Sequence, residues 1–158
     1  MIRATELNWS RILDLKQNNT ILFRVDASEQ IGSGHVMRCL TLADELRGSC
    51  NEISFICREL PGNMIGHIET QGFGVLKLPL GMENGPWQAD AEQTKKVIRN
   101  NKLQPDWLIV DNYGLDKQWE SALRPLVKRI MVIDDLADRE HDCDLLLDQN
   151  YYRNFETR

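Results

Sequence analysis

The sequence predicts a single α/β domain, in which helices cover both faces of a mostly parallel sheet. Two observations favour this three-layer arrangement. Short apolar runs alternate along the chain with stretches whose apolar residues recur at helical spacing, and consecutive parallel strands need such helical crossovers. In addition, 158 residues with 42% apolar content suffice for one sizeable core.

The individual elements follow from local pattern. Residues 21–25 form the first expected strand, and the next helix, at 35–47, carries an apolar stripe from Val36 to Leu46 at a period of 3.6. Further strands are expected at residues 53–57, 75–78, 107–110, 130–133 and 145–147, with helices at 61–70, 91–100 and 117–127 and a polar loop at 81–90. Residues 1–20 are interpreted as an extension with one amphipathic helix, for which Thr5 is a possible N-cap.

Polar residues follow most of the predicted strands. The strand ends are Val25-Asp26, Cys57-Arg58, Val110-Asp111-Asn112-Tyr113, Ile133-Asp134-Asp135 and Leu147-Asp148-Gln149-Asn150. In a parallel sheet these ends share one edge, where α/β proteins bind ligands. The sequence therefore predicts a polar cleft there, although about half of these carboxylates could simply cap the following helix.

A glycine-rich loop precedes the first predicted helix of this domain. Gly32 and Gly34 allow the backbone to approach a ligand closely, and the free N–H groups of the helix favour an anion or a sugar hydroxyl beside His35. The dinucleotide-binding fingerprint is incomplete, because Met37 stands at the position of its third glycine. The simpler alternative is a tight turn followed by a structural histidine.

Composition excludes several classes of function. A net charge of −5 argues against a nucleic-acid partner, and we find no signal peptide or membrane-spanning run, so a cytoplasmic protein without a membrane partner is expected. Its four cysteines lack a zinc-type spacing and are interpreted as structural thiols. Residues 138–144 offer carboxylates, an imidazole and a thiol, but consecutive residues rarely converge on one metal ion, so no metal site is expected.

Six stretches of the chain together resemble one enzyme family, the UDP-sugar hydrolases of pseudaminic acid biosynthesis and their spore-coat polysaccharide homologues. The matching stretches, in the order expected for the family, are residues 23–28, 31–39, 55–58 with 62–63, 111–115, 133–139 and 143–150. Together they cover about residues 21–152, which is far more specific than any single motif.

The resemblance implies a fold, an activity and a set of site residues. The fold is the N-terminal Rossmann-like half of a two-domain glycosyltransferase-B architecture. The implied activity needs no metal or cofactor: water attacks the anomeric carbon of the UDP-sugar substrate with inversion, and UDP leaves. The family's active-site histidine falls on His35 and a substrate-contacting tyrosine on Tyr113. The other expected substrate contacts are Gly32, Ser33, Gly34, Arg38, Arg58 and Asn112, with Arg24 and Asp26 as secondary candidates.

The family is roughly twice as long as this chain. We therefore expect residues 21–150 to form the N-terminal domain and residues 151–158 to begin the linker to a C-terminal domain, the partner that supplies most of the UDP contacts in this architecture. Hydrolysis by the chain alone is expected to be weak. The alternative functions are a non-catalytic α/β binding or scaffold module and a glycosyltransferase domain.

Of the three histidines, His35 suits the chemistry best. An imidazole can accept a proton from water near neutral pH, and only His35 lies at the predicted cleft. His67 falls within a predicted helix and is expected at the surface, while His141 lies in an acidic stretch and is expected to pair with a carboxylate.

Overall fold

The computed structural model describes residues 15, 18–48, 52–81 and 85–150, and it contains a six-stranded sheet. The strands are β1 (Thr20–Val25), β2 (Glu52–Arg58), β3 (Gly74–Leu78), β4 (Trp107–Asp111), β5 (Arg129–Ile133) and β6 (Leu145–Leu147). Their spatial order is β3-β2-β1-β4-β5-β6, and all five pairings are parallel. The predicted α/β fold is confirmed, with a wholly parallel sheet and the strand order of a Rossmann-like domain.

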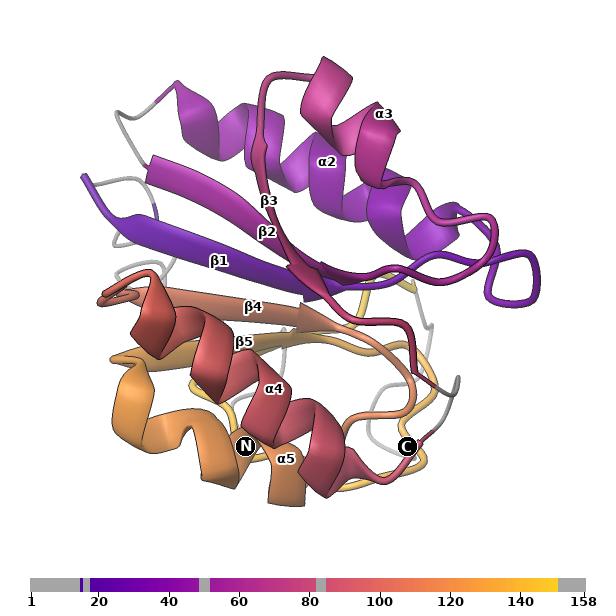
Figure 1. The fold of residues 1–158 in the computed structure, drawn as a ribbon. Coiled ribbons are helices and arrows are strands. Elements are labelled where there is room, and N and C mark those ends of the chain that lie inside the picture. The colour runs from indigo at the N-terminus through magenta and orange to yellow at the C-terminus, as the bar shows by residue number, and fades with distance from the viewer. Residues whose placement is uncertain (1–14, 16–17, 49–51, 82–84, 151–158) are drawn as a thin grey trace.

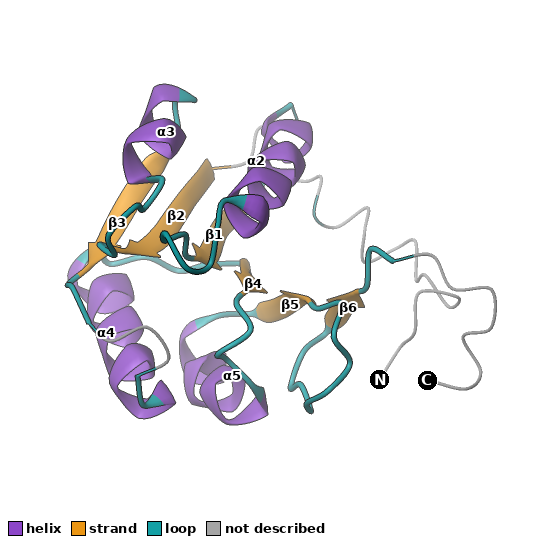
Figure 2. Cartoon of the chain, turned by 90° about the vertical axis from the view of Figure 1, so that its right-hand side faces the viewer, coloured by secondary structure: helices purple, strands orange, loops and turns teal. Residues whose placement is uncertain are grey.

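Helices lie on both faces of this sheet (Figures 1 and 2). The helices are α2 (Gly34–Arg47), α3 (Ile65–Thr70), α4 (Trp87–Asn100) and α5 (Lys117–Leu123), which continues into the 3-10 turn η2 (Arg124–Leu126). Helices α2 and α3 cover one face, and α4 and α5 cover the other, giving the three expected layers. No described helix exceeds 14 residues, and none provides an apolar span across a bilayer.

The strands are apolar on both faces because both faces are covered. In β1, Phe23 points to the side of α2 and α3, where it stacks on Phe55 with ring centroids 4.9 Å apart. The neighbouring Leu22 belongs to the opposite core, where Trp119 of α5 is fully buried. Successive residues of one strand thus contribute to two separate cores, which fixes the sheet between its helices.

Three predicted helix boundaries were wrong. The helix expected at 61–70 begins only at Ile65, because Gly62 has a φ of +75° and the Asn63 side chain accepts from the N–H of Ile65 in a tight turn. Helix α4 begins at Trp87, directly after Pro86, so the expected loop at 81–90 ends earlier. Helix α5 ends at Leu123 and gives way to a 3-10 turn at Pro125, whose ring nitrogen has no hydrogen to donate.

The direction in which successive strands are added to the sheet reverses between β1 and β4. Strands β2 and β3 lie on one side of β1, while β4, β5 and β6 lie on the other, so the loops after β1 and β4 leave in opposite directions. The crevice between two such loops is where open α/β sheets bind ligands. The amphipathic helix predicted within residues 1–20 and the linker at 151–158 fall on residues that the structure does not describe, apart from Leu15 and residues 18–20. Leu15 is buried in the core with α2.

Candidate functional site

His35 lies in the first turn of α2 and is held by the carboxylate of Asp111, the last residue of β4. The distance from His35 Nδ1 to Asp111 Oδ1 is 2.6 Å, and the Asp111 side chain is fully buried. A carboxylate only accepts hydrogen bonds, so this contact favours a proton on Nδ1. Arg38 Nη2, which can only donate, lies 3.0 Å from the same nitrogen and favours the opposite tautomer. We assign the proton to Nδ1 because the contact with Asp111 is the shorter of the two. In the neutral imidazole, the unprotonated nitrogen is then Nε2, the atom that can accept a proton from water.

Arg38 lies one turn further along α2 and makes a forked contact with the same carboxylate. Its Nε and Nη2 each lie 2.5 Å from an oxygen of Asp111, and its Nη1 lies 3.4 Å from Oδ2 of Asp135. Bidentate arginine–carboxylate pairs are both strong and directional. Arg38 therefore fixes the orientation of the carboxylate that in turn orients His35.

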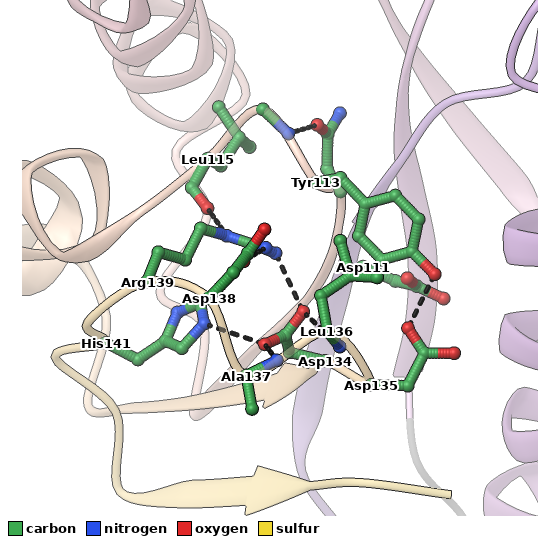
Figure 3. A network of polar contacts seen from close by, with 12 residues as sticks. Asp111, Tyr113, Leu115, Asp134, Asp135, Leu136, Ala137, Asp138, Arg139 and His141 are labelled. Carbon is green, nitrogen blue, oxygen red and sulfur yellow. Dashed lines mark hydrogen bonds and ion pairs between the residues drawn. The ribbon is translucent and has the colours of Figure 1, made fainter. Parts of the chain in front are cut away.

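Tyr113 covers the imidazole from the loop after β4. Its ring meets the His35 ring edge to face, with centroids 4.5 Å apart and planes at 82°. The hydroxyl donates to Oδ1 of Asp135 at 2.5 Å, as Figure 3 shows, and about 41% of the Tyr113 surface remains exposed. Burial and the contact with Asp135 raise the pKa of Tyr113 above its ordinary value, so the phenol stays protonated and can donate a hydrogen bond.

The loop that presents His35 is closed by its own backbone. The N–H of Gly32 donates to the carbonyl of Ser28 at 2.9 Å, and Gly32 has a φ of +80°, which a residue with a side chain rarely adopts. The Ser28 hydroxyl accepts from two further N–H groups of this turn. Ser33 makes no side-chain cap on α2, so the N–H groups that open the helix remain available to an anion.

A second group of charged side chains lies at the same edge, toward α4. Arg24 forms ion pairs with Asp26 at 2.7 Å and with Asp90 at 2.6 Å, and Arg58 contacts Asp90 at 2.7 Å. Burial works against the charge of Asp90, but the ion pairs with Arg24 and Arg58 prevail and lower its pKa to about 2. Trp119 also donates its indole N–H to Asp90 at 2.9 Å. Two arginines and two aspartates thus form a buried cluster without net charge.

A pocket of about 210 Å³ opens above this cluster. Its lining includes Arg24, Asp26, Arg58, Asp90, Gln93 and Asn112 together with the apolar side chains of Ile31, Leu60, Pro86 and Leu115. The Asn112 amide donates to Asp26 at 3.1 Å, and because Asn112 follows Asp111, it joins the pocket to the His35 cluster. Gln93 has a buried side-chain oxygen without a hydrogen-bond partner among the described residues.

The structure therefore divides the predicted site residues into two neighbouring groups. The first contains His35, Arg38 and Tyr113, and the second, around the pocket, contains Arg24, Asp26, Arg58 and Asn112. The loop residues Gly32, Ser33 and Gly34 connect β1 to α2, and they place His35 over the end of β4.

Three carboxylates of the site were not among the predicted site residues. Asp111 and Asp135 stand at strand ends that the sequence identifies as polar, but no local signal distinguishes them from helix-capping aspartates. Asp90 was interpreted as part of a loop, although it lies inside α4.

The two remaining histidines lie apart from this site. His67 is exposed on α3, as predicted. His141 pairs with Glu120, with Nδ1 2.7 Å from the carboxylate, as expected for a histidine in an acidic stretch. The acidic residues around it are engaged elsewhere, since Asp142 and Asp144 both contact Arg124. Among the described residues, no three potential ligands are grouped to hold a metal ion.

Comparison with known proteins identifies two relatives of this chain by sequence. No known protein-family model matches the sequence. An uncharacterized protein of Methanocaldococcus jannaschii is 33% identical over 111 residues, which make up 70% of this chain and 20% of that protein. A UDP-2,4-diacetamido-2,4,6-trideoxy-beta-L-altropyranose hydrolase of Campylobacter jejuni is 31% identical over 133 residues, which make up 84% of this chain and 42% of that enzyme. The chain spans less than half the length of both relatives, and it is related to the second over most of its own length.

Proposed function

We propose that this chain is the N-terminal half of a nucleotide-sugar hydrolase in which His35 directs a water molecule at the anomeric carbon. The observation that carries the proposal is the 2.6 Å contact between His35 Nδ1 and the buried Asp111. With the proton of the imidazole on Nδ1, shared with that carboxylate, Nε2 is free to act as a base. The sequence relationship to a UDP-sugar hydrolase supports the same reaction class.

The reaction is a displacement at the anomeric carbon. His35 Nε2 accepts a proton from water, the water oxygen bonds to the anomeric carbon, and the bond from that carbon to the diphosphate oxygen breaks. Attack on the side opposite the leaving group inverts the configuration, and UDP leaves with the electron pair. Asp111 stabilises the imidazolium that forms, as the aspartate of a catalytic triad does. The N–H groups that open α2, which the Ser33 side chain does not cap, favour negative charge nearby.

The pocket beside His35 suits the sugar better than the diphosphate. Its two arginines are neutralised by Asp26 and Asp90, so it offers no net positive charge to a phosphate. Its volume of about 210 Å³ lies below the 300–1,000 Å³ that is typical of whole drug-sized ligands, so it suits one sugar ring or a substituent. An acetamido N–H would also give the oxygen of Gln93 a partner. Under this proposal, a C-terminal domain holds most of the UDP.

The binding test separates the sugar from the nucleotide. In amide NMR spectra of the 158-residue chain, 2,4-diacetamido-2,4,6-trideoxy-L-altrose is expected to shift the signals of Asn112, Gly114 and Gln93, which line the pocket. UDP at the same concentration is expected to leave them in place. The reverse pattern would show that the pocket is a phosphate site and would overturn this assignment of the two halves.

The activity test follows release of UDP from the UDP-linked sugar by phosphorus NMR. We expect slow release by this chain and faster release by a two-domain version, meaning this chain joined to the proposed C-terminal domain. We expect loss of release in His35→Asn, because asparagine is polar but accepts no proton near neutral pH. Binding of the sugar with no release of UDP by the two-domain version would favour the alternative of a binding module. Release by His35→Asn at the wild-type rate would show that another group is the base.

A further inference from the structure

A buried polar network lies behind the site, between the loop after β5 and helix α5. It consists of Glu120, Asp134, Arg139 and His141, and Figure 3 shows its part around Asp134. None of the four was among the expected substrate contacts, although Asp134 stands at one of the polar strand ends. Two carboxylates and two potential cations, all nearly removed from water, are costly to bury unless their charges balance.

His141 balances this network only in its protonated form. Nδ1 lies 2.7 Å from Oε1 of Glu120, Nε2 lies 3.5 Å from Oδ2 of Asp134, and the His141 side chain is 3% exposed. Nδ1 makes a hydrogen bond to Glu120, whereas Nε2 makes none among the described residues and only faces the charge of Asp134. Both carboxylates nevertheless favour a proton on the nitrogen that they face. With His141 charged, the two buried carboxylates, Glu120 and Asp134, face two cations. With His141 neutral they face only Arg139, which also pairs with the exposed Asp138 at 2.8 Å.

Arg139 extends the network to the site. Its Nη2 lies 3.0 Å from Oδ1 of Asp134, and its Nε donates to the carbonyl of Leu115 at 3.1 Å. The guanidinium carbon lies 5.6 Å from the centre of the Tyr113 ring, within cation–π range. The Arg139 side chain thus joins the loop that carries Tyr113 to the loop that carries Asp135. The Asp135 carboxylate in turn accepts a hydrogen bond from the Tyr113 hydroxyl.

We propose that Arg139 and His141 are positioning residues, which hold Tyr113 and Asp135 against His35 and make that placement dependent on the proton of His141. The effect on turnover rests on the proposed hydrolase function, but the effect on the geometry does not. When His141 loses its proton, Asp134 and Glu120 lose a shared cation. The loop of residues 134–141 then loosens, together with the contact between Tyr113 and Asp135.

The direction of the pH dependence follows from the groups that face His141. These are Glu120 from α5, Asp134 from the end of β5, and Arg139 from the loop itself. Burial works against the charged imidazole, but the contact with Glu120 prevails and raises the pKa of His141 above its ordinary value. The network is therefore complete below the ordinary histidine pKa, and it is lost as the pH rises through the raised value of the folded protein.

The test measures the Tyr113–His35 contact by NMR in the 158-residue chain. Nuclear Overhauser peaks between the two rings are expected below the ordinary histidine pKa and should fade as the pH rises through the titration of His141, in step with the ring-nitrogen shifts of His141. In Arg139→Gln the peaks should be absent throughout, and in His141→Gln they should be weak and independent of pH above neutrality. Lys117→Gln is the matched control, because it breaks only the exposed contact to Glu140 in the same loop.

Two results would overturn the proposal: contacts between the Tyr113 and His35 rings that persist unchanged in Arg139→Gln, or contacts that do not change while His141 loses its proton. If Arg139→Gln does not fold, Arg139→Lys is the second test, because lysine keeps the charge beside Asp134 but cannot also reach the carbonyl of Leu115. Contacts between the Tyr113 and His35 rings at wild-type strength in Arg139→Lys would count against the proposal. In a two-domain version, Arg139→Lys should lower kcat about 10- to 100-fold while KM changes little. A version that is inactive even as wild type would refute the hydrolase function but leave the NMR result standing.

Discussion

Replacement of Asp90 by asparagine should destabilise this protein more than most single substitutions. Asp90 accepts from Arg24, Arg58 and Trp119 at distances of 2.6 to 2.9 Å, and its side chain is only 12% exposed. Asparagine has nearly the same shape but no charge. Among the described residues, the change therefore leaves Arg24 with Asp26 as its ion-pair partner and Arg58 with no side-chain ion pair.

The pKa of Asp90 sets the scale of this effect. A decrease in this pKa from 3.8 to about 2 corresponds to about 2–3 kcal/mol of stability at neutral pH. Removal of one partner from a buried ion pair typically costs about 3–5 kcal/mol. We therefore expect Asp90→Asn to lose about 3 kcal/mol in its free energy of unfolding.

The pH dependence has a definite sign. The pKa of Asp90 is lowered on folding, so its contribution is fully present above the unfolded value near 3.8 and is lost as the pH falls through about 2. The difference in stability between wild type and Asp90→Asn should hence be large at neutral pH and shrink in strong acid.

Urea unfolding followed by tryptophan fluorescence is a suitable assay, because Trp119 itself contacts Asp90. Glu92→Gln is the matched control on the same helix, since Glu92 is exposed and its ion pair among the described residues is with Lys95, one turn away. Its urea midpoint should stay at the wild-type value. A loss of less than about 1 kcal/mol in Asp90→Asn would show that the buried ion pairs contribute little net stability and would refute the reasoning.

Three other predictions concern the site and its surroundings. Asp111→Asn should lower the rate of UDP release by a two-domain version about 10²- to 10⁴-fold, because an amide can donate to Nδ1 of His35 and place the ring proton on Nε2 instead; a near-normal rate would show that the tautomer is not controlled here. Gly32→Ala should destabilise the loop by about 1 kcal/mol because φ is +80°, whereas Gly34→Ala, with open space at its Cβ, should have a clearly smaller effect; equal shifts in melting temperature would argue against backbone strain. Burial raises the pKa of the Cys57 thiol to about 12, so it should resist alkylation in the folded protein and react at the rate of unfolding, which mass spectrometry can follow.

Much of the fold was predictable because its signals are local. Each predicted strand in the described residues is present, within one residue at either end, since an apolar run bounded by polar residues identifies a buried parallel strand. The helix boundaries that failed depend on backbone details, such as the positive φ of Gly62 and the early start of α4 after Pro86. A few turn residues determine those details, and the spacing of apolar residues along the sequence does not reveal them.

The sequence by itself determined that a glycine loop with a histidine shares one sheet edge with Asp111, Asn112 and Tyr113, because parallel strands all end at the same side. Only the tertiary structure decided which carboxylate pairs with which basic side chain. Asp111 meets His35 from 76 residues away, and Asp90 meets Arg24 from 66 residues away. These pairs follow from the placement of β1 between β2 and β4, a long-range choice that depends on how the whole apolar surface of the sheet is buried and that no local run of residues specifies.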